Sequence, residues 1–438
     1  MLRRTFALTI ITCLALGAFA FADEEIVFLA GEWVLDTDVG RFEEVYGYNF
    51  LDKFKEETGI TVKIEGYPFN QLFEIIEVRM NAKDPKVGGI WVDSPLTASY
   101  AVRGYTQPVP EDLFTEEELQ QFFPATVEIA TWEGKLSNVP FETSSQVMYI
   151  NKALFEEAGV EAPVMDVNQR WTWAQVVDAS QKIQAALNSG EQHNVWGLLF
   201  DQVSRPYQML ALPQSLGAGS GVSPDGLSVD GYLNNEGWVK AMQWWYDTHN
   251  TWEISPKGTE VGEGSGLFSA GNVAMFVGGT WNIPAFMDAN EEGRLDFDIV
   301  PHPYFKEGQP VTATNSWHLA ISPYSSNPDA AAKFIKYMVS KDIREKLFKA
   351  NGQLTAHTVM SDVIENDPEY DLFPKNAYKK IVSYELANTA MPRPTTPFYL
   401  EWEDTVTKAF EDIRNGADPK KTLDQYVSIL ERLAKKYR

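Results

Sequence analysis

The sequence predicts an α/β fold of two lobes in series, each a sheet covered by helices. Short apolar runs of strand length alternate with longer stretches that have helical periodicity. Such strand–helix–strand alternation is typical of a mainly parallel sheet with helices on its faces. The alternation begins near Ile26, is interrupted around Pro140 and then starts again, so we expect one sheet from each block. A length of 438 residues suits two or three domains of ordinary size.

The first block opens with an apolar strand over residues 26–30. The spacing of Tyr46, Phe50 and Phe54 predicts a helix over 46–58, and Gly59 is typical of the residue that follows a helix end. The alternation then continues with a strand over 60–64, a helix over 70–82, a strand over 87–92, a helix over 123–130 and a strand over 135–140 that Pro140 interrupts.

The second block repeats the pattern and ends in helices. Its expected strands cover residues 147–150, 195–200, 273–277, 297–300 and 319–322. Its expected helices cover 152–158, 172–187, 237–248, 283–288, 329–339, 341–350, 374–387, 400–415 and 419–436. The glycine-rich stretches 217–221 and 262–266 predict loops.

The first 22 residues have the three parts of a signal peptide. Arg3 and Arg4 precede an apolar run over residues 5–16, and Ala20-Phe21-Ala22 fits a cleavage site. The run is shorter than the ~18 apolar residues of a membrane-spanning helix. We therefore expect cleavage after Ala22 and export to the periplasm or the outer cell surface. The single cysteine, Cys13, lies inside this segment, which leaves a lipid anchor as the alternative.

The amino-acid composition narrows the classes of molecule that the protein is expected to bind. Lys and Arg total 37 against 61 Asp and Glu, a net charge of −24. A surface this acidic repels phosphate backbones and anionic lipids, so we expect no nucleic-acid partner. Five histidines and one cysteine are too few and scattered for a zinc site, and we expect no metal and no cofactor. The 13 Trp, 18 Tyr and 25 Phe suit either core packing or a ligand site lined with rings.

Polar and aromatic residues gather next to the predicted strands, where open α/β sheets bind their ligands. They are Glu32 and Trp33 after the first strand, Asp93 and Ser94 after the third, Glu142, Thr143 and Ser144 after the proline-interrupted strand, Gly279 and Trp281 after strand 273–277, and Trp317 just before strand 319–322. Each one alone also fits a surface charge, a helix cap or a core edge. Together, carboxylates, hydroxyls and indole rings suit a neutral polyhydroxylated ligand, whose hydroxyls need hydrogen-bond partners and whose ring face stacks on an aromatic plane.

Four longer stretches carry more specific motifs. They are residues 139–160 with Trp171-Thr172-Trp173, residues 267–276 followed by Gly279-Thr280-Trp281, residues 317–322 with 327–335, and Met391-Pro392-Arg393-Pro394 with Phe398-Tyr399. In this order they resemble the extracellular solute-binding proteins (family one) of ABC sugar importers, relatives of the maltose- and trehalose-binding proteins. The likeness covers nearly all of the chain after residue 22.

The resemblance implies a two-lobed periplasmic-binding-protein fold whose lobes are discontinuous in sequence and joined by a hinge. Lobe 1 would comprise residues 23–142 and 307–341, and lobe 2 residues 143–306 and 342–438. Chain crossings would lie near residues 140–143, 303–310 and 340–344. A monomeric receptor of this kind closes on a carbohydrate and delivers it to the membrane permease subunits of the importer.

The resemblance also implies roles for individual residues. Asp93 and either Glu142 or Thr143 would accept hydrogen bonds from sugar hydroxyls, Arg393 would donate them, Trp281 would stack on the sugar, Tyr399 would line the C-terminal wall, and Glu32 and Trp33 would lie on a ligand-facing loop. Trp317 stands where many relatives have a glycine pair, so its ring is expected to shorten the site.

Two other functions stay open at this point. A polyol or other small hydroxylated solute would need the same polar groups without the stacked ring. A glycoside hydrolase would need two carboxylates about the scissile bond, for which Asp93 and Glu142 are the candidates. We expect binding without catalysis, because the resemblance is to binding proteins.

Overall fold

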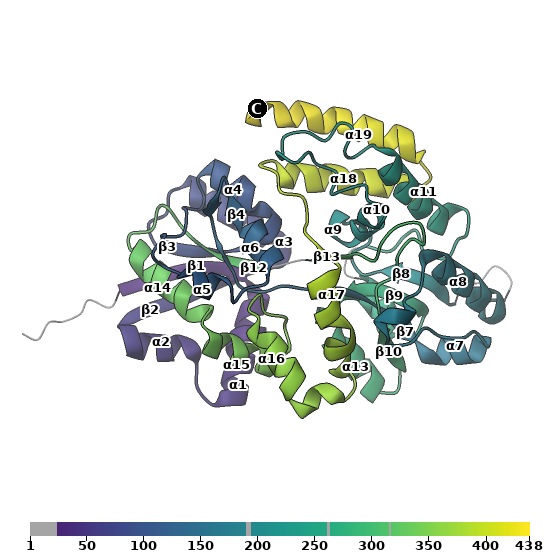
Figure 1. The fold of residues 1–438 in the computed structure, drawn as a ribbon, viewed down its shortest axis with the longest axis horizontal. Coiled ribbons are helices and arrows are strands. Elements are labelled where there is room, and N and C mark those ends of the chain that lie inside the picture. The colour runs from purple at the N-terminus through teal and green to yellow at the C-terminus, as the bar shows by residue number, and fades with distance from the viewer. Residues whose placement is uncertain (1–23, 190–193, 261–262, 315–316) are drawn as a thin grey trace, which may run out of the picture.

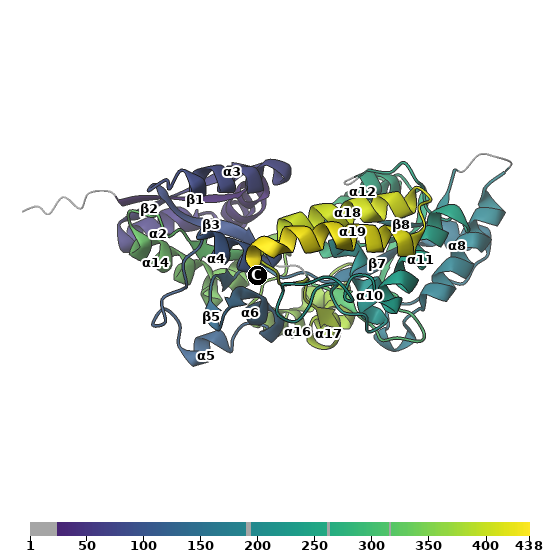
Figure 2. The same ribbon diagram turned by 90° about the horizontal axis from the view of Figure 1, so that it is seen from above.

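The computed structural model describes residues 24–189, 194–260, 263–314 and 317–438 (Figure 1). The expected signal peptide lies outside these residues. Two lobes stand side by side, each with its own sheet (Figures 1 and 2). Within the described residues, no helix combines the length and apolar character needed to cross a bilayer.

The sheet of lobe 1 has five strands in the order β2-β1-β3-β12-β6 within the described residues. The strands are β1 (Glu24–Gly31), β2 (Ile60–Tyr67), β3 (Val87–Asp93), β6 (Val139–Pro140) and β12 (Trp317–Ile321). β1 pairs in parallel with β2 and β3, whereas β12 runs antiparallel to its neighbours β3 and β6. The predicted mainly parallel sheet is therefore confirmed, and the antiparallel strand is the one that returns from the second lobe.

Helices cover both faces of this sheet. They are α1 (Arg41–Tyr46), α2 (Phe50–Thr58), α3 (Phe69–Asn81), α4 (Thr97–Arg103), α5 (Glu116–Leu119), α6 (Pro124–Ala130), α14 (Pro328–Met338) and α15 (Lys341–Asn351). Alternate residues of β1 enter different cores, as strand geometry requires: Phe28 packs with α2 and α14 through Phe54 and Phe334, and Leu29 faces the other way. Residues 342–351, expected in lobe 2, form most of α15, which packs on α1 of lobe 1.

The sheet of lobe 2 has four strands in the order β10-β7-β9-β8 within the described residues. They are β7 (Gln146–Asn151), β8 (Trp196–Phe200), β9 (Val273–Gly279) and β10 (Phe297–Val300). β8 and β9 are parallel, and β7 runs antiparallel to β9 and β10. The surrounding helices include α7 (Lys152–Ala158), α8 (Trp173–Leu187), α9 (Pro206–Met209), α10 (Ala211–Ser215), α11 (Glu236–Asn250), α12 (Glu263–Ser269), α13 (Ile283–Glu291), α18 (Tyr399–Arg414) and α19 (Pro419–Ala434).

Short strands and loops join the lobes. β11 (Thr312–Ala313) pairs in parallel with β13 (Ala390–Met391), which follows α16 (Val359–Asn366) and α17 (Ser383–Asn388). The first chain crossing, which leads into β7, contacts this pair of strands. The backbone N–H of Gln146 donates a hydrogen bond to the Thr312 hydroxyl at 3.0 Å. Figure 1 shows α16 and α17 between the two lobes on the side opposite the C-terminus.

Four sequence predictions of local structure were wrong. The strand expected over 135–140 is two short strands, β5 (Lys135–Leu136) and β6, which belong to different sheets. The helix expected over 46–58 is two helices, because Gly47 adopts the left-handed conformation (φ 71°) and Asn49 caps the start of α2. The glycine-rich residues 263–266 belong to α12, where Gly264 lies against the chain after β8; a Cβ there would come within 3.2 Å of the Phe200 carbonyl oxygen. Trp317 lies inside a strand instead of before it, because β12 pairs with β3 from Trp317 opposite Asp93 onwards.

Candidate functional site

A buried ion cluster joins the lobes at the carboxyl end of β3. Asp93 of lobe 1 accepts hydrogen bonds from both terminal nitrogens of Arg393, with its Oδ2 lying 3.1 Å from Arg393 Nη1. A second guanidinium from lobe 2, that of Arg205, lies 3.5 Å from the same carboxylate. The side chains of Asp93 and Arg393 are 3% and 0% exposed. The structure thus brings together two residues that were predicted separately, and they bind each other across the junction.

Lobe 2 balances the charge of this cluster. Glu403 of α18 accepts from Arg205 Nε at 3.0 Å, and the Tyr399 hydroxyl lies between Arg393 and Glu403 at 3.5 and 3.4 Å. Burial alone would lower the pKa of Arg205 and of Arg393, but the neighbouring carboxylates outweigh it and raise both. Two permanent cations therefore face two carboxylates, an arrangement that leaves the site without a large net charge for a ligand to neutralise.

Lobe 1 adds a cluster of aromatic rings beside Asp93. The Trp33 ring lies 4.9 Å from that of Trp317 and 6.0 Å from that of Phe69, while Phe73 is stacked on Trp317 at 6.5 Å. Trp33 lies two residues after the end of β1, Trp317 begins β12, and Phe69 and Phe73 share one face of α3 at a spacing of one helical turn. The ends of three elements thereby converge on one aromatic surface.

Lobe 2 presents a second aromatic surface, formed around Trp281. Its ring is 38% exposed, and its Nε1 donates to Asp201 at 3.0 Å. The Tyr207 ring lies 6.2 Å from Trp281, and its hydroxyl is 3.0 Å from the Ser144 hydroxyl. Burial raises the pKa of Asp201, an effect that the hydrogen bonds from Asn282 and Trp281 oppose. The indole is therefore anchored by its polar edge, with ring surface left open to solvent.

The two aromatic surfaces are connected through Arg205. Its guanidinium lies 5.1 Å from the centre of the Phe69 ring in lobe 1 and 5.9 Å from that of Tyr207 in lobe 2. Arg393 also lies over Tyr207, at 5.1 Å. Cations over ring faces are favourable contacts, so the seam between the lobes combines ion pairs with cation–π contacts.

Glu142 lies in a different polar cluster from Asp93. It is buried near Asp38 and Arg344 of lobe 1, with Arg344 stacked 3.9 Å above the Phe141 ring. Burial and the charge of Asp38 raise the pKa of Glu142 despite the opposing charge of Arg344. Burial likewise raises the pKa of Asp38 to about 7 and lowers that of Arg344 to about 10.

The remaining predicted residues are placed as follows. The Thr143 hydroxyl contacts that of Thr314 at 3.1 Å, Gly279 accepts from the Tyr149 hydroxyl at 2.8 Å, Ser94 is fully buried, and Glu32 is exposed. Thr143 and Gly279 therefore already have hydrogen-bond partners within the protein. Polar contacts between one predicted site residue and another concentrate on Asp93, Arg393 and Tyr399.

Sequence reasoning missed Phe69, Asp201, Arg205 and Tyr207. Asp201, Arg205 and Tyr207 could have been found, because residues 201–207 directly follow the predicted strand 195–200. The other candidate site residues were identified from the same position next to a predicted strand. Phe69 begins a helix, and nothing in its neighbourhood distinguishes it from a core residue.

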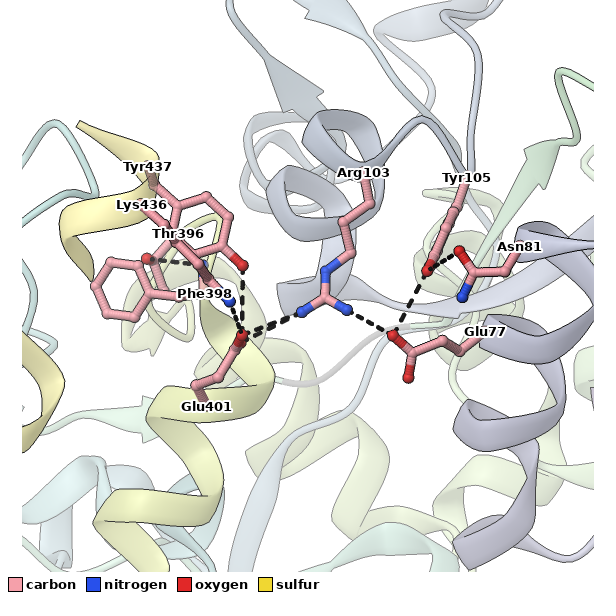
Figure 3. Close-up of polar contacts among 9 residues, drawn as sticks. All are labelled: Glu77, Asn81, Arg103, Tyr105, Thr396, Phe398, Glu401, Lys436 and Tyr437. Atoms are coloured by element: carbon pink, nitrogen blue, oxygen red, sulfur yellow. Dashed lines mark hydrogen bonds and ion pairs between the residues drawn. The ribbon is translucent and has the colours of Figure 1, made fainter. Parts of the chain in front are cut away.

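A second set of polar contacts joins the lobes nearer the C-terminus. Arg103, at the end of α4, lies between Glu77 of α3 and Glu401 of α18, at 2.8 and 3.2 Å (Figure 3). Lys436 and Tyr437 also donate to Glu401, at 2.9 and 3.3 Å. This outer network therefore ties the last residues of the chain to both lobes.

A surface pocket of about 430 Å³ lies elsewhere, on lobe 2 between α8, α11 and residues 305–307. Trp173, Trp244 and Phe305 are among its lining residues. In the described residues, no three His, Cys, Asp or Glu side chains are grouped so as to hold a metal ion.

Comparison with known proteins adds a family match. The family model for bacterial extracellular solute-binding proteins matches residues 41–345. A probable ABC transporter-binding protein of Deinococcus radiodurans is 24% identical over 79% of this chain and 79% of its own length. The galactooligosaccharide-binding protein of Bacillus subtilis is 24% identical over 85% of this chain and 82% of its own length.

Solved structures share the fold. An ABC transporter solute-binding protein from Thermotoga lettingae, bound with α-D-tagatose, superposes with a TM-score of 0.76 at 20% identity. The match covers 94% of this chain and all of that one. The predicted two-lobed fold is therefore confirmed along nearly the whole chain.

Proposed function

Since the chain belongs to the bacterial extracellular solute-binding proteins, we propose that it is the sugar-capturing receptor of an ABC importer. It binds a sugar between its lobes and presents it to membrane permease subunits, as an exported monomer without catalytic activity. The division into lobes at residue 142 belongs to the same proposal, with the second boundary moved from residue 341 to the end of α15 at Asn351.

One observation carries this proposal: residues from both lobes meet at the carboxyl ends of their sheets, with aromatic rings on each side and ionised groups between them. Trp33 and Trp317 lie on one side and Trp281 on the other, and Asp93 and Arg393 meet at the junction. Rings suit the apolar face of a pyranose, and charged donors and acceptors suit its hydroxyls. A ligand that bridges both sides stabilises the closed arrangement through contacts that an open form lacks.

Relatives support a sugar without fixing its length. The Bacillus subtilis relative is named for galactooligosaccharides, whereas the Thermotoga lettingae structure holds a single sugar. The acidic net charge and the balanced ion cluster favour a neutral sugar over an anionic one.

Calorimetric titration of the mature protein with mono-, di- and oligosaccharides and with polyols tests this function. We expect saturable binding of at least one neutral sugar, and a Trp281→Ala variant that weakens it by roughly 1–3 kcal/mol through loss of a buried ring contact. Trp196→Ala, at the far end of β8, is the control. Binding of polyols alone would favour the small-solute alternative, and steady release of hydrolysis products would overturn the receptor in favour of a glycoside hydrolase.

A further inference from the structure

The outer network contains a row of four charged side chains whose signs alternate across the junction (Figure 3). Lobe 1 contributes Glu77 and Arg103, whose charged atoms are 2.8 Å apart, and lobe 2 contributes Glu401 and Lys436, at 2.9 Å. The two pairs meet where Arg103 Nη2 lies 3.2 Å from Glu401 Oε1. Each lobe therefore brings a complete ion pair to the junction, and within this row one ion pair crosses from lobe to lobe.

Contacts inside each lobe support the two outer members of the row. In lobe 1 the Tyr105 hydroxyl lies 3.5 Å from Glu77 Oε1 and 3.0 Å from Asn81 Oδ1. In lobe 2 the Tyr437 hydroxyl donates to Glu401 Oε1 at 3.3 Å. None of these contacts depends on how the lobes meet. Both ion pairs are therefore expected to persist when the lobes separate.

The alternation also brings like charges together. Glu77 and Glu401 lie on different terminal nitrogens of Arg103, and Arg103 and Lys436 both lie within 3.2 Å of Glu401 Oε1. The members of each like-charged pair come from opposite lobes, so their repulsion arises only when the lobes are together. Glu77 and Lys436 attract each other, but they stand at the two ends of the row (Figure 3), where the attraction is weaker than the nearer repulsions.

We propose that Glu77 and Lys436 limit the affinity of the receptor for its sugar, because each opposes the approach of the lobes that Arg103 and Glu401 favour. The inference rests on the proposed function, in which a sugar is bound as the lobes close. It adds two residues that adjust affinity from outside the ion cluster of Asp93 and Arg393. A receptor that hands its sugar on needs a closure that reverses readily, and these repulsions supply part of that reversibility.

Neutral variants test the sign of this effect. Glu77→Gln removes the repulsion of Glu401, and Lys436→Gln removes the repulsion of Arg103, so each should raise sugar affinity although each breaks an ion pair. The two side chains are 46% and 56% exposed, so we expect a gain of about twofold in calorimetric titrations near 10 mM salt. The rate of sugar dissociation, followed by tryptophan fluorescence, should fall in proportion. The gain should vanish near 1 M salt, where screening is strongest.

Two kinds of control separate this effect from a general change of charge. Glu74→Gln, one turn earlier on α3, and Lys435→Gln make the same changes of charge outside the row and should leave affinity unchanged. In a Glu401→Gln background, Glu77→Gln should no longer raise affinity, because the carboxylate that it repels is gone. A gain of equal size in that background would mean that Glu77 acts within lobe 1, and the inference would be rejected.

Failure of this inference is distinguishable from failure of the proposed function. If the unmodified protein binds a sugar and the Glu77→Gln and Lys436→Gln variants bind it equally well or more weakly, the inference is rejected and the receptor stands. If the unmodified protein binds no sugar, the proposed function is rejected. Small-angle X-ray scattering of the ligand-free protein at low salt then decides whether the repulsion opposes closure: a smaller radius of gyration for Glu77→Gln than for the unmodified protein supports it, and an equal or larger one rejects it.

Discussion

The lobes are joined by two sets of ion pairs that differ mainly in burial. In the inner set Asp93 and Arg393 are 3% and 0% exposed, and in the outer set Arg103 and Glu401 are 20% and 21% exposed. Both sets pair one lobe with the other, but the inner set lies away from water and the outer set is partly exposed to it. The two sets therefore differ in how much stability is lost when one partner is removed. Removing one partner from a buried pair leaves an uncompensated charge away from water, whereas water compensates an exposed one. The inner set is therefore expected to dominate the stability of the junction, and the outer set to adjust it.

The largest effect is expected when the inner carboxylate is neutralised. Asp93→Asn leaves the guanidinium groups of Arg393 and Arg205 facing an amide, and we expect a loss of roughly 3–5 kcal/mol in unfolding free energy. Urea denaturation followed by circular dichroism measures it. Asp84→Asn is the matched control, because its partner Arg79 keeps Glu65 at 2.9 Å, and it should cost no more than about 1 kcal/mol. Equal losses in the two variants would contradict the comparison.

A third buried arginine, Arg344, extends the comparison. It lies near Asp38 and Glu142, and burial raises the pKa of both carboxyl groups. Burial raises the pKa of Asp38 to about 7 from an ordinary 3.8, against the opposing effects of Arg344, Thr37 and Asn351. The folded protein thus holds this proton more tightly than the unfolded chain, and the stability gained is complete below pH 4 and lost as the pH rises through 7.

We therefore expect the stability difference between the unmodified protein and Asp38→Asn to shrink from pH 4 to pH 7 in urea titrations. Asp84 gives the opposite sign: backbone hydrogen bonding from Lys86 lowers its pKa, with Arg79 contributing further. Its contribution is present above an ordinary carboxyl pKa and disappears as the pH falls. Parallel slopes for Asp38→Asn and Asp84→Asn would rule out a buried proton on Asp38.

The inner set also shows how far sequence reasoning reaches. Strand ends and family motifs located Asp93, Arg393 and Tyr399 separately, and periodicity located the strands of both sheets. Nothing in the sequence indicates that Asp93 and Arg393 bond to each other, because they are 300 positions apart and the contact depends on how two lobes meet.

Conflicts between local sequence preference and tertiary packing explain the other differences between the predicted and the observed structure. Glycines in residues 263–266 predicted a loop because glycine disfavours helices in isolation, yet α12 packs so closely against the chain after β8 that a Cβ at Gly264 would make a tight contact. Phe69 could not be distinguished from a core residue, since only its contact with Arg205 of the other lobe places it at the junction. Tertiary contacts, which composition and periodicity do not encode, decided each case.

The smallest effect is expected in the outer set. Arg103→Gln removes the bonds to Glu77 and Glu401 (Figure 3), although Lys436 and Tyr437 still contact Glu401. Because these groups are partly exposed, we expect sugar affinity to fall by no more than about fivefold, equivalent to about 1 kcal/mol. The loss should be evident near 10 mM salt and nearly absent near 1 M, where the screening length shrinks from roughly 30 Å to 3 Å.

Arg79→Gln is the matched control for this last variant. Arg79 has a similar exposure, 23%, and likewise pairs with two carboxylates, but Glu65 and Asp84 both belong to lobe 1. It should lower the stability of lobe 1 and leave sugar affinity unchanged at either salt concentration. An equal, salt-independent change of affinity in both variants would mean that Arg103 acts through the packing of lobe 1 and not across the junction. A salt-dependent loss confined to Arg103→Gln would instead show that an exposed pair, too weak to hold the lobes, still biases how readily they stay together around a ligand.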